Sequence, residues 1–403
     1  MENILDVTQK VLVDNTIVDA EVHSYQAYIA SKFDYNDEIR IPIQEFDTYT
    51  LPCESYLYIE GKLTKDDDKA VANLKFINNA IAFLFREIRY ELNGVTVDFV
   101  RNVGLTSTLK SYLSYNSNES VKLENSGWFP KGDGLKPDVN GNFNACIPLK
   151  LLLGFFEDYR KIMLNMKQEL VLIRSGSDVD AVIGPDDKEK PKVSIEKIVW
   201  RMPHISVGIS EQLALTKIIN RNVDILLPFR SWELVEYPTL TQTKTHTWPV
   251  KTTTKLETPR HIIFALQVDR KGKLTKDMSQ FDHCDLYNIR LFLNSERYPY
   301  NDLYLNFSQQ KFATLYEMFA NFRKSYYGLP SEPIFTPTEF LTKSPISHID
   351  CSHQKDTIQT GAVVMRLEFE TSTNVPDKTS AYCLILHDKL FSYNPLTKIV
   401  KQL

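Results

Sequence analysis

The hexapeptide Gly61-Lys-Leu-Thr-Lys-Asp66 occurs again as Gly272-Lys-Leu-Thr-Lys-Asp277. Shortly after each copy comes the pattern Ile-Arg-x-x-Leu-Asn, first from Ile88 to Asn93 and then from Ile289 to Asn294. One such match arises easily, because a strand that ends in a polar turn often uses these residue types. Two matches in the same order, about half a chain apart, indicate a duplicated domain, and an internal repeat decides the architecture of a chain.

The composition is typical of a packed globular protein that is rich in strands. The chain has 403 residues, enough for two domains of about 200 residues each. Its 22 Phe and 20 Tyr favour β structure, because large aromatic side chains pack well across a pleated surface. The net charge of -4 excludes a generally basic nucleic-acid binder, although a local basic face stays open.

The cysteines and the apolar runs indicate the cellular compartment in which the protein is made. The chain has no Cys-x-x-Cys pair, and its cysteines are scattered, as is typical of free thiols in a reducing environment. The amino terminus lacks the basic and apolar regions of a signal peptide. The longest apolar run, residues 80–85, is too short to span a bilayer. We therefore expect a protein made in the cytosol or nucleus, without a membrane span.

Alternating apolar and polar residues predict many short strands. The segment from Ser55 to Thr64 alternates well and indicates a half-buried strand. Ile39 to Ile43 predicts another, and Pro42 within it favours the edge of a sheet, since proline donates no ladder hydrogen bond. Two polar segments, residues 116–142 and 175–192, are predicted to be long loops.

A hairpin followed by a helix is predicted in each half. The first hairpin turns at Asn93-Gly94, because a two-residue type I′ turn needs positive φ at both positions. The second turns at Asn294-Ser295. Apolar residues at helical spacing follow both hairpins: Leu105, Leu109, Tyr112 and Leu113, and then Phe312, Leu315, Tyr316, Phe319 and Phe322.

These elements define a fold class and a domain division. Many short strands joined by long loops favour antiparallel sandwiches, and a jelly roll builds about eight strands into two facing sheets. We predict an all-β fold of two tandem antiparallel eight-stranded jelly rolls, with short helices after the hairpins. The predicted units are an amino-terminal arm (1–15), a first jelly roll (16–209), a linker helix capped by Ser210 (210–221) and a second jelly roll (222–403).

The chain lacks the motifs of common enzymes. The pairs Gly61-Lys62 and Gly272-Lys273 have neither the upstream glycine nor the Ser/Thr of a phosphate-binding loop. The best metal candidate runs from His348 through Cys351 to His353, with His283-Cys284 as distant partners, since zinc takes four N or S ligands. That second pair is adjacent rather than spaced, which favours ordinary loop residues. We therefore predict no catalytic, cofactor-binding or metal-binding residue, and no enzyme.

Three further groups have both a functional and a plain structural interpretation. The paired carboxylates Glu157-Asp158 and Asp186-Asp187 are suited to acid–base chemistry, but such pairs are usually solvated. The aromatic stripe from Phe312 to Phe322 suits a partner groove, but a core-facing helix is the simpler interpretation. Basic residues suited to phosphate contact are interleaved with acids, which favours an ordinary surface: Lys188, Lys190, Arg270 to Lys276, Lys398 and Lys401.

Several stretches resemble a known family. They are Phe85 to Gly94, Cys146 to Phe155, Gln168 to Arg174 and Asp285 to Asn294. With two tandem jelly rolls in about 400 residues, the chain resembles the double jelly-roll major capsid proteins of double-stranded DNA viruses. It is most similar to those of Polinton or Maverick elements and of adintovirus-like or virophage-like agents. The resemblance is diffuse and covers most of the chain.

The resemblance implies a structural role. It implies pseudo-hexameric homotrimers that tile an icosahedral shell and contact neighbouring capsomers and penton or minor capsid proteins, without reading a nucleic-acid sequence. The protein would then be located in the virion, after synthesis in the host cytoplasm or nucleus. Two other classes stay open on the residues alone. One is a two-domain β-sandwich that binds carbohydrate or a receptor, and the other is a glycosidase with two carboxylates.

Overall fold

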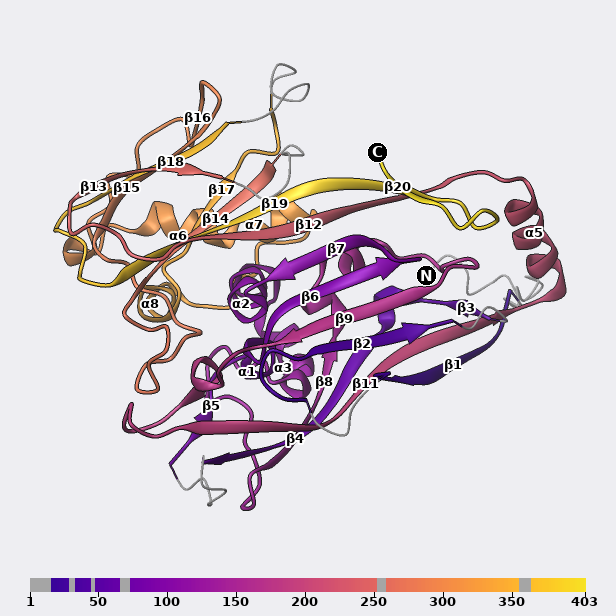
Figure 1. Ribbon diagram of the computed structural model, residues 1–403. Coiled ribbons are helices and arrows are strands. Elements are labelled where there is room, and N and C mark those ends of the chain that lie inside the picture. Colours follow the sequence, from indigo (N-terminus) through magenta and orange to yellow (C-terminus); the bar gives the residue numbers. More distant parts are fainter. Residues whose placement is uncertain (1–15, 29–32, 45–47, 66–72, 252–258, 355–363) are drawn as a thin grey trace, which may run out of the picture.

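The computed structural model describes residues 16–28, 33–44, 48–65, 73–251, 259–354 and 364–403, so the predicted arm over residues 1–15 lies outside the described residues. Its strands form two pairs of antiparallel sheets, one from residues 17–207 and one from residues 225–402 (Figure 1). Among the strands that the structure describes, no sheet mixes strands from the two halves. The two halves are therefore separate jelly rolls, called here the first and the second roll.

The first roll contains two main sheets. One has the order β1 (Ile17–Gln26), β11 (Pro191–Val207), β4 (Tyr56–Lys65) and β8 (Asn142–Pro148), with β3 (Tyr49–Thr50) also on β11. The other has the order β2 (Glu38–Ile43), β9 (Gln168–Arg174), β6 (Phe85–Leu92) and β7 (Val95–Arg101). A small ribbon pairs β5 (Lys75–Phe76) with β10 (Val182–Ile183).

The second roll repeats this plan. One sheet has the order β12 (Ile225–Tyr237), β19 (Thr379–Tyr393), β14 (Pro259–Val268) and β17 (Ser347–Asp350), with β20 (Val400–Gln402) on β19. The other has the order β13 (Thr245–Val250), β18 (Met365–Thr371), β15 (Leu286–Leu293) and β16 (Glu296–Tyr298).

The strand order confirms the predicted pair of eight-stranded jelly rolls. When the eight principal strands of each half are numbered along the chain, both halves have the sheet orders 1-8-3-6 and 2-7-4-5. The Ile-Arg-x-x-Leu-Asn pattern lies at the same place in both, on β6 and on β15, and ends in a hairpin turn. The hexapeptide copies are not equivalent, because the first lies on β4 up to Lys65 and the second lies in the turns after β14.

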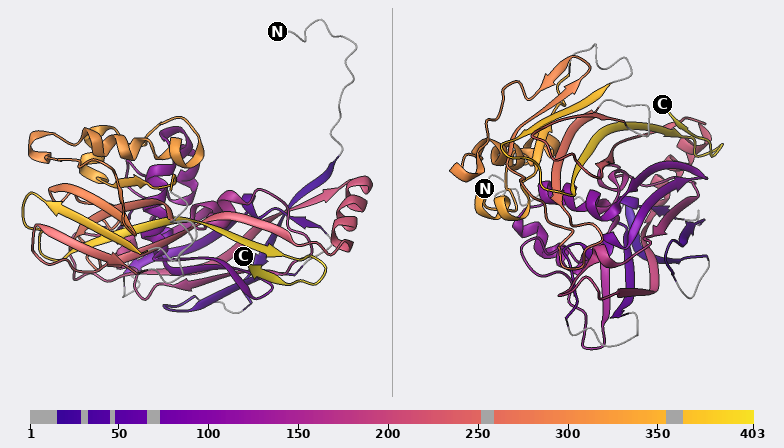
Figure 2. Two further views of the ribbon diagram at one scale, coloured as in Figure 1. Left: turned by 90° about the horizontal axis from the view of Figure 1, so that it is seen from above. Right: turned by 60° about the vertical axis from the view of Figure 1, so that its left-hand side comes forward.

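Helices fill the connections between strands. As predicted, a helix follows each hairpin: α2 after β7, and α6 and α7 after β16. In Figures 1 and 2, α5 stands apart from the other helices at one end of the molecule. The helices are α1 (Ala80–Phe83), α2 (Val103–Ser114), α3 (Ser117–Leu123), α4 (Gly154–Asp158), α5 (Ile209–Asn220), α6 (Ala313–Ala320), α7 (Phe322–Tyr327) and α8 (Pro337–Lys343). Short 3-10 turns occupy Pro52–Glu54, Glu124–Ser126, Leu149–Leu151, Val179–Ala181 and Phe307–Gln309.

Three local predictions need correction. Residues 116–142 are not simply an exposed loop, because they contain α3 and the buried Trp128. Residues 175–192 contain β10. Helix α5 begins at Ile209 with Gly208 as its cap residue, so Ser210 lies within the helix and does not cap it. Pro42, by contrast, lies where predicted, since β2 is at the end of its sheet.

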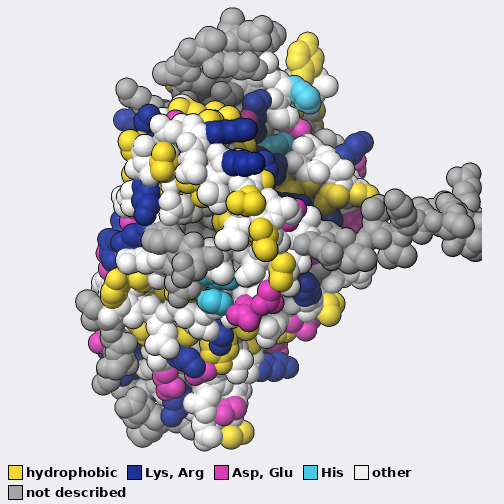
Figure 3. Space-filling view, turned by 90° about the vertical axis from the view of Figure 1, so that its right-hand side faces the viewer, with side chains coloured by type: hydrophobic (Ala, Val, Ile, Leu, Met, Phe, Trp, Pro, Cys, Tyr) yellow, Lys and Arg dark blue, Asp and Glu magenta, His cyan; other side chains and the backbone are white. Residues whose placement is uncertain are grey.

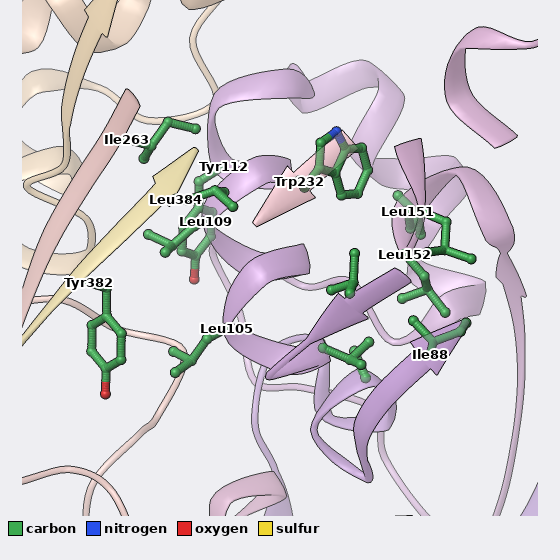
Figure 4. Close-up of a cluster of buried hydrophobic side chains, with 14 of the residues drawn as sticks. Ile88, Leu105, Leu109, Tyr112, Leu151, Leu152, Trp232, Ile263, Tyr382 and Leu384 are labelled. Atoms are coloured by element: carbon green, nitrogen blue, oxygen red, sulfur yellow. The ribbon is translucent and has the colours of Figure 1, made fainter. Parts of the chain in front are cut away.

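The hydrophobic core is one cluster that extends through both rolls. Alternate residues of β4, such as Leu57, Ile59 and Leu63, point into it. In Figure 4, Leu109 and Tyr112 project from α2 of the first roll toward the strand of the second roll that carries Leu384. Among the described residues, no helix combines the length and the apolar character that crossing a membrane requires.

Candidate functional site: the joint between the two jelly rolls

The structure does not assemble the metal candidate. His348 of β17 faces His261 of β14, and 3.1 Å separates His261 Nδ1 from His348 Nε2. Cys351 is buried, with its sulfur 3.2 Å from the carbonyl oxygen of Arg260, and His353 is exposed. Within the ranges that the structure describes, no group of three or more His, Cys, Asp or Glu side chains is arranged to hold a metal ion.

The distant partners of that candidate make local contacts. His283 Nδ1 accepts a hydrogen bond from the backbone N–H of Asp285 at 2.9 Å, and its ring stacks on Phe307. Burial raises the pKa of the Cys284 thiol to about 12. A protonated, buried thiol is a small apolar side chain rather than a reactive ligand.

Burial holds several histidines of the second roll in the neutral form. It lowers the pKa of His348 to about 4, and it lowers the pKa of His387 to about 3. Burial and then the neighbouring His348 lower the pKa of His261. These side chains add no positive charge to the fold near neutral pH, which bears on its response to acid.

The paired carboxylates differ in their surroundings, because Asp186 and Asp187 are exposed whereas Glu157 is buried and Asp158 is partly buried. Asp187 of the first roll accepts hydrogen bonds from the backbone N–H and the hydroxyl of Thr275, at 2.9 and 3.0 Å, in the second hexapeptide copy. Glu157 and Asp158 lie on α4, where both bind side chains of the second roll. The basic cluster is neutralised by acids, as Arg270 pairs with Asp282, Lys271 with Glu236, Lys273 with Asp187 and Lys276 with Asp269.

Lys110 lies at the centre of the contact between the rolls, which we call the joint. It is the only charged residue of α2, and its side chain is 2% exposed. Its ammonium donates to both carboxylate oxygens of Glu157, at 3.1 and 3.2 Å, and to the hydroxyl of Tyr327 in the second roll, at 2.6 Å. The ammonium also lies 4.8 Å from the ring centroid of Trp232 on β12. Burial lowers the pKa of Lys110, and Glu157 opposes this shift.

A second ion pair joins α4 to β12. Both carboxylate oxygens of Asp158 accept hydrogen bonds from the Arg230 guanidinium, at 2.8 and 2.6 Å, and one also accepts from the Arg230 backbone N–H at 2.8 Å. The guanidinium stacks on Tyr326, 3.6 Å from its ring centroid. A Cβ atom at Gly154 would lie 1.7 Å from the Arg230 carbonyl oxygen, so this close approach of two backbones requires glycine.

Asp98 of β7 adds a third buried connection. Its carboxylate accepts hydrogen bonds from the Ser231 hydroxyl of β12 at 2.8 Å and from the Phe155 backbone N–H at 2.9 Å. Burial raises the pKa of Asp98, and the nearby Lys389 opposes the rise. Beside it, the rings of Phe155 and Phe229 pack edge to face, with centroids 5.4 Å apart.

Further hydrogen bonds extend the joint along both rolls. Tyr112 of α2 donates to the Ser279 carbonyl oxygen at 3.0 Å. At the hairpin turn of the first roll, Asn93 donates to the Lys398 carbonyl oxygen at 2.8 Å.

Buried charges that are fully paired tolerate little displacement, because separating them leaves a charge without solvent or partner. The joint therefore fixes the angle between the rolls.

Sequence reasoning missed the joint, although one signal was present. A single lysine in the otherwise uncharged α2 predicts a buried charge with a specific partner. Its partners could not be identified, because Tyr327 is 217 residues away along the chain. The aromatic stripe of the second roll faces the core, as the simpler interpretation predicted, since Leu315, Phe319 and Phe322 are buried.

The end of the molecule near α5 is exposed and partly apolar. None of the 12 residues of α5 is buried. Figure 3 views the molecule from this end and shows apolar side chains interspersed with charged ones. The exposed large hydrophobic residues of α5, of the connection after it and of the start of β12 are Ile209, Leu213, Ile218, Val223 and Leu226.

Comparisons with known proteins identify the fold. A model of the double jelly roll-like domain matches residues 74–391. No curated protein sequence matches the chain. The Sputnik virophage structure determined by cryo-EM matches with a TM-score of 0.66 at 9% identity, over 99% of this chain and 91% of that chain. PBCV-1 VP54, as fitted into a reconstruction of the virophage Sputnik, matches with a TM-score of 0.62 at 10% identity, over 98% of each chain.

A third structure extends the comparison. The mavirus major capsid protein matches with a TM-score of 0.51 at 11% identity, over 100% of this chain and 92% of that chain. At such low identities the structural matches establish the fold alone, and the family model, which covers most of the chain, establishes membership. The chain belongs to the double jelly roll-like family.

Proposed function

We propose that this chain is a major capsid protein whose homotrimers form pseudo-hexameric building blocks of an icosahedral shell. Family membership and a fold shared with viral major capsid proteins support this role. In this proposal the functional units are an arm over residues 1–15, two wedges over residues 16–209 and 222–403, and a linker helix over residues 210–221. The protein is then located in the virion, in contact with neighbouring capsomers and with penton or minor capsid proteins.

The observation that carries the proposal is the joint. Two rolls of equal topology are held at a fixed angle by the ion pair between Asp158 and Arg230 and by hydrogen bonds between the buried Lys110–Glu157 pair of the first roll and tyrosines of the second, so each chain is a rigid pair of similar wedges. Three such pairs arranged head to tail give six similar wedges, and a ring closes when the rotation between neighbours is suitable. A loose pair of domains would not define that rotation.

The proposal is tested by the mass of the purified full chain and by electron microscopy. A chain of 46.6 kDa should sediment as a trimer of about 140 kDa, three times that mass. Six-sided particles or shells in the micrographs support the role. A protein that stays monomeric at micromolar concentration contradicts it, and a monomer that binds glycans would favour the alternative of a carbohydrate- or receptor-binding protein.

A further inference from the structure

The joint within the chain is formed by strands that have equivalents elsewhere in the molecule. In the joint, the first roll presents β7 and α4, and the second roll presents β12. Both β7 and β12 are end strands of their sheets. Because the two rolls share one strand order, β16 is the equivalent of β7 and β1 is the equivalent of β12. These two equivalents lie on opposite sides of the molecule, with the joint between them (Figure 1).

Strand β1 has the apolar face that such a contact needs. Ala20 and Val22 alternate along the strand and therefore share one face, and Val18 lies at the bulge before them. All three are exposed, with Val18 at 69% and Val22 at 49%. An apolar strand left open at the edge of a sheet readily pairs with another chain.

The equivalent face of β12 is covered. Both strands begin opposite the last residue of their partner strand, since Ile17 pairs with Val207 and Ile225 pairs with Tyr393. Val22 pairs with Pro203, four residues before the end of β11, and Phe229 pairs with Lys389, four residues before the end of β19, so Val22 corresponds to Phe229.

In the covered strand, the ring of Phe229 packs edge to face on Phe155 of the first roll. Phe229 is 4% exposed, and Ser231, on the same face, donates a hydrogen bond to Asp98 of the first roll. The same position in the fold is therefore covered within the chain in one roll and open in the other.

The side of the second roll that carries β16 presents exposed aromatic side chains. We call β16 and residues 299–304 the tyrosine edge. Tyr300 is 90% exposed and Tyr304 is 62% exposed. Large tyrosines at this level of exposure are typical of interfaces, where their rings bury much area at a low cost in conformational entropy.

We propose that β1 of one copy receives the tyrosine edge of a second copy, so that the contact between copies repeats the joint within the chain. This inference rests on the proposed trimer and specifies its interface. The contact is head to tail, because each copy contributes a different surface to each of its two neighbours. The exposed apolar residues of α5 are outside this interface. Helix α5 is therefore the alternative interface that the experiment must distinguish.

The first experiment measures the mass of full-length variants by sedimentation. Val22→Glu on β1 and Tyr300→Glu on the tyrosine edge should each reduce the mass from about 140 kDa to the monomer's 46.6 kDa. Val139→Glu is the matched control, because Val139 is 92% exposed and lies in a loop of the first roll. It should leave the trimer intact. Near-ultraviolet circular dichroism shows whether each variant is folded.

The outcomes separate the inference from the proposed function. If the wild type is a trimer and both variants remain trimers, while Leu213→Glu on α5 yields monomers, the interface lies elsewhere and the inference is wrong, although the trimer stands. If the wild type is itself a monomer, the proposed function and the inference fail together.

A second experiment does not depend on disruption. Chains with Val22→Cys and chains with Tyr300→Cys, carrying tags of different size, are refolded together and treated with a short bismaleimide. Crosslinks between the two kinds of chain, above the background from native Cys53 and Cys146, support the inference. Crosslinks that join only like chains contradict a head-to-tail contact.

Discussion

Replacing Lys110 with methionine is expected to weaken the joint more than any exposed lysine substitution would. The change keeps a long side chain but removes the charge that Glu157 faces at 3.1 Å. Glu157 is itself 8% exposed, so its carboxylate would remain buried with only hydroxyl partners. Removing one member of a buried ion pair costs about 3–5 kcal/mol, because the other charge is left uncompensated.

The double variant Lys110→Met with Glu157→Gln provides the decisive comparison. It removes both charges, so no buried ion remains, and the amide of residue 157 still accepts from Tyr326. We expect it to be more stable than Lys110→Met alone, with a coupling of about 1–3 kcal/mol between the two sites. Lys122→Met on α3 is the matched control, since Lys122 is exposed and its replacement should stay within about 0.5 kcal/mol.

Urea unfolding followed by tryptophan fluorescence measures these differences, because Trp232 lies beside Lys110 in the joint. A cost below about 1 kcal/mol for Lys110→Met would mean that the Lys110–Glu157 pair does not stabilise the joint. Simple additivity in the double variant would also refute the reasoning, since two sites that share one ion pair should be coupled.

Two further predictions concern the close approach at the joint and the response to acid. Gly154→Ala should lower the melting temperature and reduce the free energy of unfolding by about 1–3 kcal/mol, because the new Cβ would meet the Arg230 carbonyl oxygen. Gly132→Ala is the control, because open space surrounds Gly132 and the melting temperature should not change. Stability should fall as the pH drops below about 6.5, where unfolded histidines take up protons. Each of His348 and His387, with pKa values of about 4 and about 3 in the fold, would then contribute a loss of about 2 kcal/mol at pH 5. Melting temperatures between pH 5 and pH 7 test this, and His387→Phe should flatten the profile.

The sequence predicted the parts of the fold that local chemistry determines. Asn93 and Asn294 both have positive φ at the hairpin turns, as a two-residue turn requires. Pro42 marks an edge strand because it lacks the N–H that an interior strand must donate. The two copies of the Ile-Arg-x-x-Leu-Asn pattern lie at equivalent places in the two rolls, because each copy ends a strand in a hairpin turn.

The remaining features depend on partners that are distant along the chain. Trp128 is buried by packing with Tyr112, which a polar, glycine-containing segment does not reveal. Glu157 and Asp158 follow no pattern that distinguishes them from solvated acids, and only the meeting of α4 with the second roll identifies them as part of the joint. Periodicity describes one element at a time, whereas the joint is a property of two rolls.

The contrast between β1 and β12 also bears on which functional class the fold serves. A monomeric two-domain binding protein gains nothing from an exposed apolar strand at a sheet edge, which is a site of unwanted pairing. In a closed ring of duplicated rolls, the same exposure is expected, because one of the two equivalent strands can be covered only by the next copy. In the proposed interface, Tyr300 and Tyr304 of the tyrosine edge provide that cover. The exposure of Val18 and Val22 therefore favours an assembling chain over a solitary carbohydrate- or receptor-binding module.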